Sequence, residues 1–117
     1  MTATTATALS ALDLIERDVR RDSRVLDSKR WVDSTGTQVI TFEVDSEPDL
    51  ITAVGYSAAR DVEYTEPLMV LITEWTTYRG VRVEAQVTTE LTWQHIERDE
   101  VRGMPTIAAL RELGWDS

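Results

Sequence analysis

The chain lacks cysteine altogether and contains a single histidine among its 117 residues. Without thiols it can form no disulfide framework, zinc–thiolate site, iron–sulfur cluster or cysteine nucleophile. One imidazole also excludes any site that needs two histidine ligands. The 21 acidic and 12 basic residues leave a net charge of −9. Such a chain is poorly suited to sequence-independent nucleic-acid binding, which requires Lys and Arg to neutralise phosphates.

Lysine is nearly absent. Lys29 is the one lysine, and arginine supplies the rest of the 12 Lys and Arg residues. Acidic excess with little lysine is typical of proteins from a salt-rich cytoplasm, where carboxylates hold surface water and lysine stems would expose methylene groups. Codon bias in a GC-rich genome produces the same composition. We therefore expect a halophilic or GC-rich source, such as a haloarchaeon, an actinobacterium or a virus of one.

Long hydrophobic runs are also missing. The longest uninterrupted apolar run, Leu68–Ile72, is far shorter than a membrane-spanning helix. The first seven residues contain neither the basic nor the apolar region of a secretory signal. We expect a soluble protein in the cytoplasm, or in a virion if the chain is viral. Its 42% hydrophobic content supports a packed core, and its length supports one domain over residues 1–117.

The first predicted element is an amphipathic helix over residues 7 to about 25, capped by Thr5 or Thr7. Its apolar positions recur at helical spacing: Ala8, Leu12, Ile15, Val19 and Leu26. The opposite face carries the one basic cluster of the sequence: Arg17, Arg20, Arg21 and Arg24. Interspersed aspartates favour a solvated face. The alternative is a docking stripe for an acidic partner or nucleic acid.

Two segments in the middle of the chain differ in clarity. Residues 31–44 predict a β-hairpin that turns at Ser34–Gly36, because apolar and polar residues alternate after the turn. Residues 50–64 are ambiguous. Ser46 and Pro48 suit the start of a helix, whereas Thr52 and Val54 alternate as in a strand, and we favour the strand.

The clearest pattern is a second, long hairpin over residues 68–77 and 81–93, with arms of about ten residues. A two-residue turn at Arg79–Gly80 would pair Tyr78 with Val81. A three-residue turn would pair Thr77 with Val81 and align Met69, Leu71 and Trp75 with the face that carries the valines. We favour the three-residue turn because it collects the apolar groups on one face.

The C-terminal segment predicts a short helix that starts at Pro105 or Thr106 and ends at Gly114, with Trp115 folded back onto its last turn. The order of elements defines the class as α+β. We expect an N-terminal amphipathic helix packed on an antiparallel sheet with a long β-hairpin, followed by the short helix.

No sequence motif indicates catalysis. The chain has no G-x-S-x-G elbow, phosphate-binding loop or dinucleotide fingerprint. His95 shares the parity of Leu91 and Trp93, which predicts a strand-end or core histidine. A weaker alternative is a metal site with three nearby acidic residues: Glu97, Asp99 and Glu100. We expect no enzyme activity, no metal and no cofactor.

Four tryptophans require a place in the fold. We expect Trp75 and Trp93 on the inner face of the sheet, and Trp31 and Trp115 at the core edges. Alternatively one or two of them anchor an interface, since Trp and Arg dominate binding energy at interfaces. The projecting tip of the long hairpin and the C-terminus form the predicted self-association surface: Tyr78, Arg79, Arg82 and Trp115.

These patterns predict a non-enzymatic structural or assembly protein that binds protein partners, as a homo-oligomer or ring in a larger assembly. A small virion component of the head–tail connector or tail-completion type fits best. The alternative is an acidic inhibitor or immunity-type protein that offers carboxylates to a basic partner. It would use the acidic segments at residues 43–49 and 97–100.

We predict that the protein gains stability as salt concentration rises. A net charge of −9 repels itself, and the Debye length shrinks from about 10 Å at 0.1 M salt to about 3 Å at 1 M. The melting temperature should therefore rise between these two concentrations by more than it does for a near-neutral domain of similar size. A flat or falling profile would contradict the high-salt interpretation.

Overall fold

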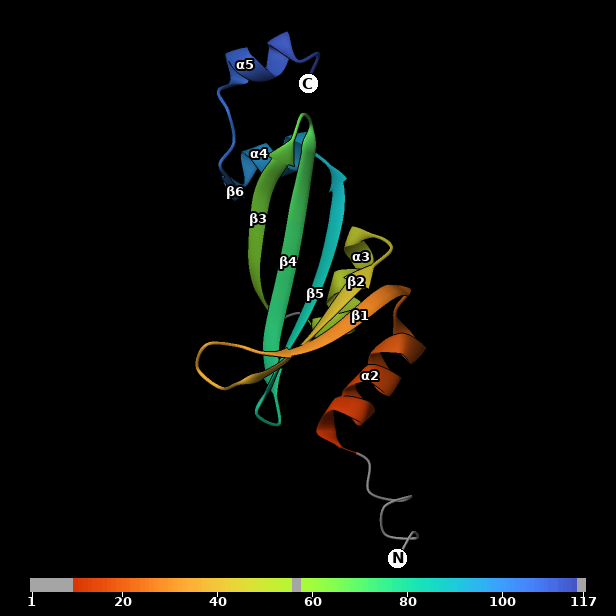
Figure 1. Ribbon diagram of the computed structural model, residues 1–117. Coiled ribbons are helices and arrows are strands. Elements are labelled where there is room, and N and C mark those ends of the chain that lie inside the picture. Colours follow the sequence, from red (N-terminus) through yellow and green to blue (C-terminus); the bar gives the residue numbers. More distant parts are fainter. Residues whose placement is uncertain (1–9, 56–57, 116–117) are drawn as a thin grey trace, which may run out of the picture.

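A six-stranded sheet with four helices forms the protein in a computed structural model, which describes residues 10–55 and 58–115 (Figure 1). The helices are α2 (Ala11–Asp22), α3 (Glu47–Val54), α4 (Trp93–Glu97) and α5 (Ile107–Glu112). The strands are β1 (Val25–Val32), β2 (Gln38–Val44), β3 (Ala59–Glu66), β4 (Met69–Tyr78), β5 (Val81–Glu90) and β6 (Val101–Arg102). The predicted α+β class is confirmed, with an N-terminal helix before the sheet and a short C-terminal helix.

The strands lie in the order β1-β2-β5-β4-β3-β6. Both predicted hairpins are present as antiparallel pairs, β1 with β2 and β4 with β5. The sheet as a whole is mixed, because β5 returns to lie parallel to β2 and β6 lies parallel to β3. This topology puts β2 inside the sheet, where Val39, Ile40 and Phe42 are fully buried.

Helix α2 begins later and ends earlier than the apolar spacing predicts. Ser10 and Asp13 form a reciprocal capping box at its start, and Ser23 ends it in an extended conformation. Leu26 therefore belongs to strand β1, where pairing with β2 replaces helical hydrogen bonds, and not to the apolar face of the helix. Thr5, Thr7 and Ala8 lie outside the described residues. Ile15 and Val19 are buried as predicted.

The long hairpin has the two-residue turn, so the predicted register is wrong. Tyr78 pairs with Val81, and Arg79 and Gly80 adopt left-handed backbone angles, with φ of 52° and 76°. The inner face of β4 therefore carries alternate residues that begin with the buried Val70 and Ile72 and continue through Glu74. The residues predicted to face the valines lie on the other face: Met69, Leu71 and Trp75.

The ambiguous segment is a helix followed by a strand. Pro48 lies in the first turn of α3, and Leu50 and Val54 are buried one turn apart. Gly55, with φ of 91°, ends the helix in a conformation that favours glycine. The strand that we favoured across this region is therefore wrong for residues 50–54, and β3 begins only at Ala59. Residues 50–54 are helical because the four-residue spacing puts Leu50 and Val54 on one helix face, which packs against the sheet.

The core lies on one face of the sheet, which α2 and α3 cover (Figure 1). We call this the covered face, and it is built from alternate strand residues together with the two helices. Its buried members include Ile40, Phe42, Val44, Leu50, Val62, Val70, Ile72, Val83, Ala85 and Val87. The opposite side, which we call the second face, carries Trp31, Thr41, Trp75, Arg82 and Glu84.

The molecule is elongated, with principal extents of 66 × 29 × 22 Å. The β4–β5 turn lies at one end of the long axis, and α4 and α5 lie at the other (Figure 1). Helix α5 ends as predicted, since Gly114 has φ of 92° and the N–H of Trp115 donates to the Leu110 carbonyl at 3.0 Å.

The two-residue turn makes a testable prediction, because it alone requires a left-handed conformation at Arg79. Arg79→Asn should leave stability unchanged or raise it by up to about 1 kcal/mol, since Asn tolerates that conformation. Arg79→Val should lower it, because a β-branched residue is strained there. Chemical denaturation measures both changes, and equal stability of the Asn and Val variants would contradict the turn.

Candidate functional site

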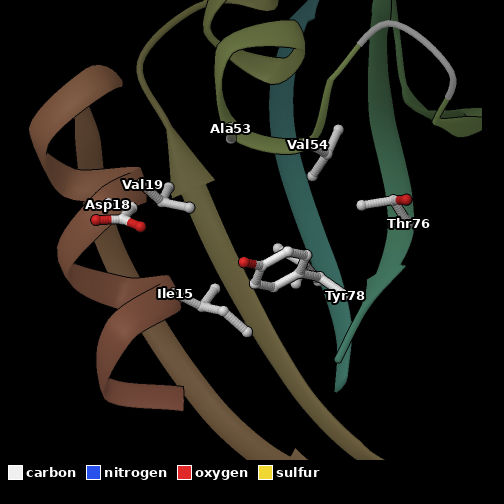
Figure 2. Close-up of a pocket in the computed structure, with 8 residues that line it drawn as sticks. Ile15, Asp18, Val19, Ala53, Val54, Thr76 and Tyr78 are labelled. Carbon is white, nitrogen blue, oxygen red and sulfur yellow. The ribbon is translucent and has the colours of Figure 1, made fainter. Parts of the chain in front are cut away.

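A largely apolar cavity of about 230 Å³, whose lining also includes the polar side chains of Asp18 and Thr76, lies beside the hairpin end between α2, α3 and the covered face of the sheet. Ile15 and Val19 line it from α2, and Ala53 and Val54 line it from α3. The ring of Tyr78 points from β4 toward α2 and forms part of its wall (Figure 2). Tyr78 is nevertheless 51% exposed, so the cavity opens next to an accessible aromatic side chain.

The predicted tip residues divide between the two faces of the hairpin. Arg79 lies over the ring of Tyr78, with its guanidinium carbon 5.4 Å from the ring centroid. Arg82 points to the second face, where it stacks on Trp75 at 4.8 Å and bonds Glu84 at 2.6 Å. Because Arg82 is held by these partners, the accessible tip consists of Tyr78 and Arg79.

The other predicted interface residue, Trp115, lies at the opposite end of the molecule. It stacks on Trp93 with 5.6 Å between ring centroids and an angle of 21° between the rings. Trp93 is 47% exposed and not an inner-face residue as predicted, because β5 ends at Glu90 and the short helix α4 turns the indole outward. Leu113 nearby on the chain is also exposed.

The basic cluster of α2 pairs with carboxylates of the same chain. The closest nitrogen–oxygen distances are 3.3 Å for Arg17–Asp18, 3.3 Å for Arg20–Glu16, 3.1 Å for Arg21–Asp22 and 3.7 Å for Arg24–Asp45. Exposed pairs of this kind contribute little to stability. They do neutralise the stripe locally, which favours a solvated helix face over a docking surface for anions.

A cluster of charged side chains between the helices and the sheet was missed in the sequence. Arg60 of β3 donates hydrogen bonds to Glu74 of β4 at 2.6 Å, to Glu47 of α3 at 2.8 Å and to Glu100 at 3.0 Å. Glu74 is only 7% exposed. Arg60 and Glu74 are direct partners in the β3–β4 register, a relation that becomes visible only when that register is known.

His95 extends this ion cluster into α4. It is 2% exposed, as expected of a core histidine, although it lies in a helix and not at a strand end. The backbone N–H of Thr92 donates to its Nδ1 at 3.0 Å, and its Nε2 lies 3.5 Å from a Glu47 carboxylate oxygen. The imidazole therefore connects α4 to α3.

The sequence-based alternative at His95 was a metal site. Glu97 and Asp99 are exposed, and Glu100 is bonded to Arg60. Within residues 10–55 and 58–115, no group of three His, Asp or Glu side chains is arranged to hold a metal ion.

The electrostatics of the cluster stabilise its charged state. Burial opposes ionisation of Glu47, but the hydrogen bond and charge of Arg60, together with the contact to His95, outweigh it and lower the pKa of this carboxyl. Burial likewise opposes the charge of Arg60, yet its three carboxylate partners raise the pKa of the guanidinium. The cluster thus joins α3, β3, β4 and the segment after α4 by charge-assisted hydrogen bonds.

A polar chain crosses the second face of the sheet and was also missed in the sequence. The indole nitrogen of Trp31 donates to the Thr41 hydroxyl at 3.0 Å, and this hydroxyl donates to Glu84 at 3.1 Å. Glu84 in turn accepts from Arg82, which stacks on Trp75. These side chains fix one another across β1, β2, β5 and β4.

Comparison with known proteins finds no matching family model, no similar curated protein and no similar solved structure. In the part of the chain that the structure describes, no helix is long and apolar enough to cross a membrane.

We predict that acid destabilises the protein in part through Glu47. A carboxyl whose pKa is lowered by folding contributes stability that is present above the unfolded-state pKa, about 4.3 for Glu, and is lost as pH falls through the lower folded-state value. Asp13 and Asp33 act in the same direction, because hydrogen bonds from Arg30 and Thr35 lower the pKa of each.

The measurement is the free energy of unfolding as a function of pH. Glu47→Gln should flatten the acid side of the curve relative to the unmodified chain, whereas Glu97→Gln, at an exposed position outside the cluster, should not. Identical acid slopes for the unmodified chain and Glu47→Gln would show that ionisation of this carboxyl does not raise the free energy of unfolding.

Proposed function

We propose that the protein is a non-enzymatic assembly subunit that binds further copies of itself head to tail. The observation that carries this proposal is the presence of different apolar surfaces at the two ends of an elongated molecule. The end with the β4–β5 turn has the cavity beside Tyr78. The end where α4 and α5 lie (Figure 1) includes the exposed Trp93, in α4, and Leu113, which follows α5. Contacts between unlike surfaces are heterologous, and they close into a ring when the rotation between copies permits.

The size of the cavity supports a side chain as its occupant. Small-molecule sites usually measure about 300–1,000 Å³, whereas a cavity of about 150 Å³ already accommodates benzene. At about 230 Å³, this cavity suits one large apolar side chain of a neighbouring copy. Trp93 is the appropriate donor, because it is exposed and the stack on Trp115 fixes its orientation.

Within this class we keep the sequence-based proposal of a small oligomeric virion component, of the head–tail connector or tail-completion type. Rings and stacked rings are the geometry that heterologous contacts generate. The halophilic or GC-rich source remains part of the same proposal.

The alternative, an acidic inhibitor of a basic protein, has less support from the geometry. Its acidic segments should present free carboxylates to a partner. Glu47 and Glu100 instead bind Arg60, and Asp45 pairs with Arg24 at 3.7 Å. Glu47 and Glu100 would have to give up Arg60 before binding a basic target, which leaves the exposed Glu43, Glu97 and Asp99 as the accessible carboxylates of these segments.

We predict that changes at either end abolish the same oligomer. Tyr78→Ser with Arg79→Glu removes the acceptor end, and Trp93→Ser removes the donor end. Each variant alone should lose the ring and every other head-to-tail oligomer in native mass spectrometry at high salt. An equimolar mixture should regain a single head-to-tail contact between the two variants, because one intact acceptor and one intact donor remain.

Ile51→Ser is the matched control, since Ile51 is an exposed apolar residue of α3 that lines neither the apolar cavity nor the Trp93–Trp115 stack. It should leave the oligomer unchanged. An unmodified chain that stays monomeric at every salt concentration, or end variants that retain the full oligomer, would overturn the proposal.

A further inference from the structure

Strand β1 forms one edge of the sheet, with β2 as its single neighbour in the strand order. Its outer side is eight residues long, whereas the strand at the opposite edge, β6, has two residues. Along the described part of the chain, no other strand pairs with that outer side. An unpaired edge of this length can add a strand from another molecule unless its side chains prevent it.

Exposed apolar side chains concentrate on this edge strand. Leu26 is 58% exposed, Trp31 is 40% exposed and Val32 is 61% exposed. They account for three of the seven large hydrophobic residues that are exposed in residues 10–55 and 58–115. Trp31 and Val32 lie on opposite faces near one end of β1 and Leu26 lies near the other end, so the strand exposes apolar side chains along its length.

The backbone of β1 presents alternate residues outward. Asp33 donates its N–H to Thr37 across the turn to β2, so odd-numbered residues direct their backbone groups toward β2. Ser28 and Arg30 therefore direct theirs to the free edge. In agreement, the N–H of Ser28 donates to the side chain of Asp27 at 2.8 Å.

We propose that β1 pairs antiparallel with β1 of a second copy about a two-fold axis that passes through Ser28. The axis must be perpendicular to the sheet, so residues that lie opposite each other share a face. With Ser28 opposite Ser28, Asp27 lies opposite Lys29 of the second copy, and Lys29 lies opposite Asp27. The pairing gives one continuous sheet across both copies.

Charge selects this register. Moving the axis by one residue places it at Asp27 or at Lys29, which sets two aspartates or two lysines directly opposite each other. In the proposed register the Asp27–Lys29 positions are not hydrogen-bonded through the backbone, and side chains approach most closely at such positions. Lys29 is the one lysine of the chain, and a charged residue on an edge strand normally prevents pairing with another molecule. In this register the opposite charge, Asp27, lies two residues away on the same strand and faces Lys29 of the second copy.

Helix α2 holds β1 ready for this pairing. Arg20 donates to the Ser28 hydroxyl at 2.8 Å, and Arg30 donates to Asp13 of α2 at 2.9 Å. These bonds occupy side chains of β1 on the covered face. Asp27 and Lys29 lie on the second face with Trp31, whose ring centroid is 5.9 Å from the Lys29 amine. The side chains on the covered face are thus fixed before a second copy arrives, and pairing then requires the N–H of Ser28 to exchange the Asp27 carboxylate for the Ser28 carbonyl of the second copy.

This two-fold contact is separate from the head-to-tail contacts proposed above and does not depend on them. The experiments therefore use a chain that also carries Tyr78→Ser and Arg79→Glu. If the head-to-tail proposal fails, the two-fold dimer should still form in this background. If the two-fold pairing fails, the loss of larger oligomers in the end variants is still measurable.

The first experiment is disulfide cross-linking, which the absence of cysteine makes clean. Backbone-bonded residues opposite each other have Cα atoms about 5.5 Å apart, within the range that a disulfide spans. Ser28→Cys should give a covalent dimer on mild oxidation at high salt. Ser34→Cys, at an exposed position in the β1–β2 turn, should not. No dimer with Ser28→Cys, or equal dimer with both variants, would overturn the proposal.

The second experiment reverses charges. Asp27→Lys places lysines opposite each other, and Lys29→Asp does the same with aspartates, so each variant should weaken the dimer about tenfold or more. Mixed in equal amounts, the two variants restore both opposite-charge pairs, and a heterodimer should recover the original affinity in sedimentation equilibrium. Recovery also shows that both chains are folded. Dimers of unchanged affinity in the single variants, or no recovery in the mixture, would contradict the register.

Discussion

The packing of the sheet and its helices depends on the charge-assisted hydrogen bond between Arg60 of β3 and the buried carboxylate of Glu74 of β4. An ionised glutamate that is 7% exposed would destabilise the sheet strongly if it had no partner. Arg60 supplies that partner directly across the β3–β4 pair, at 2.6 Å. Because Arg60 neutralises it, Glu74 can lie on the covered face of the sheet. Val70 and Ile72 alternate with it on β4 and therefore lie in the core, and this register corresponds to the two-residue turn. Replacing the arginine alone would leave a buried charge, which typically costs about 3–5 kcal/mol.

The same guanidinium positions parts of the chain that are distant in sequence. Through Glu47 it holds the start of α3, and through Glu100 it holds the segment that follows α4. His95 adds a contact from α4 itself to the start of α3, because its Nε2 lies 3.5 Å from a Glu47 carboxylate oxygen. Because α4 is fixed from its buried side, Trp93 at its start is turned outward with Trp115 against it. The exposed aromatic end therefore depends on the buried ion cluster together with the Thr92–His95 capping box that starts α4.

This dependence explains which features the sequence could predict. Both hairpins and the end of α5 follow from local patterns: alternation, turn residues and Gly114 before Trp115. The register of the long hairpin could not be predicted, because the sequence presents Glu74 as a solvent-facing residue until Arg60 is known to lie opposite. The helix at Glu47–Val54 had a visible signal in Pro48 and in the spacing of Leu50 and Val54. Where a helix start and an alternating pattern coincide, packing against the sheet determines which structure forms. That packing involves residues distant in sequence, so no local pattern reports it.

Net charge sets the conditions under which the apolar surfaces can act. Two copies that each carry −9 repel at distances up to the Debye length, and the basic stripe of α2 cannot offset this because its arginines are already paired. Short-range contacts therefore have to provide the attraction between copies. The apolar cavity and Trp93 are of this kind, since their attraction persists where salt screens the long-range repulsion. At the β1 edge the backbone hydrogen bonds persist in the same way, whereas salt weakens the exposed Asp27–Lys29 pairs. A high-salt environment, one of the two sources that the composition allows, would thus also be the environment in which these surfaces associate most strongly.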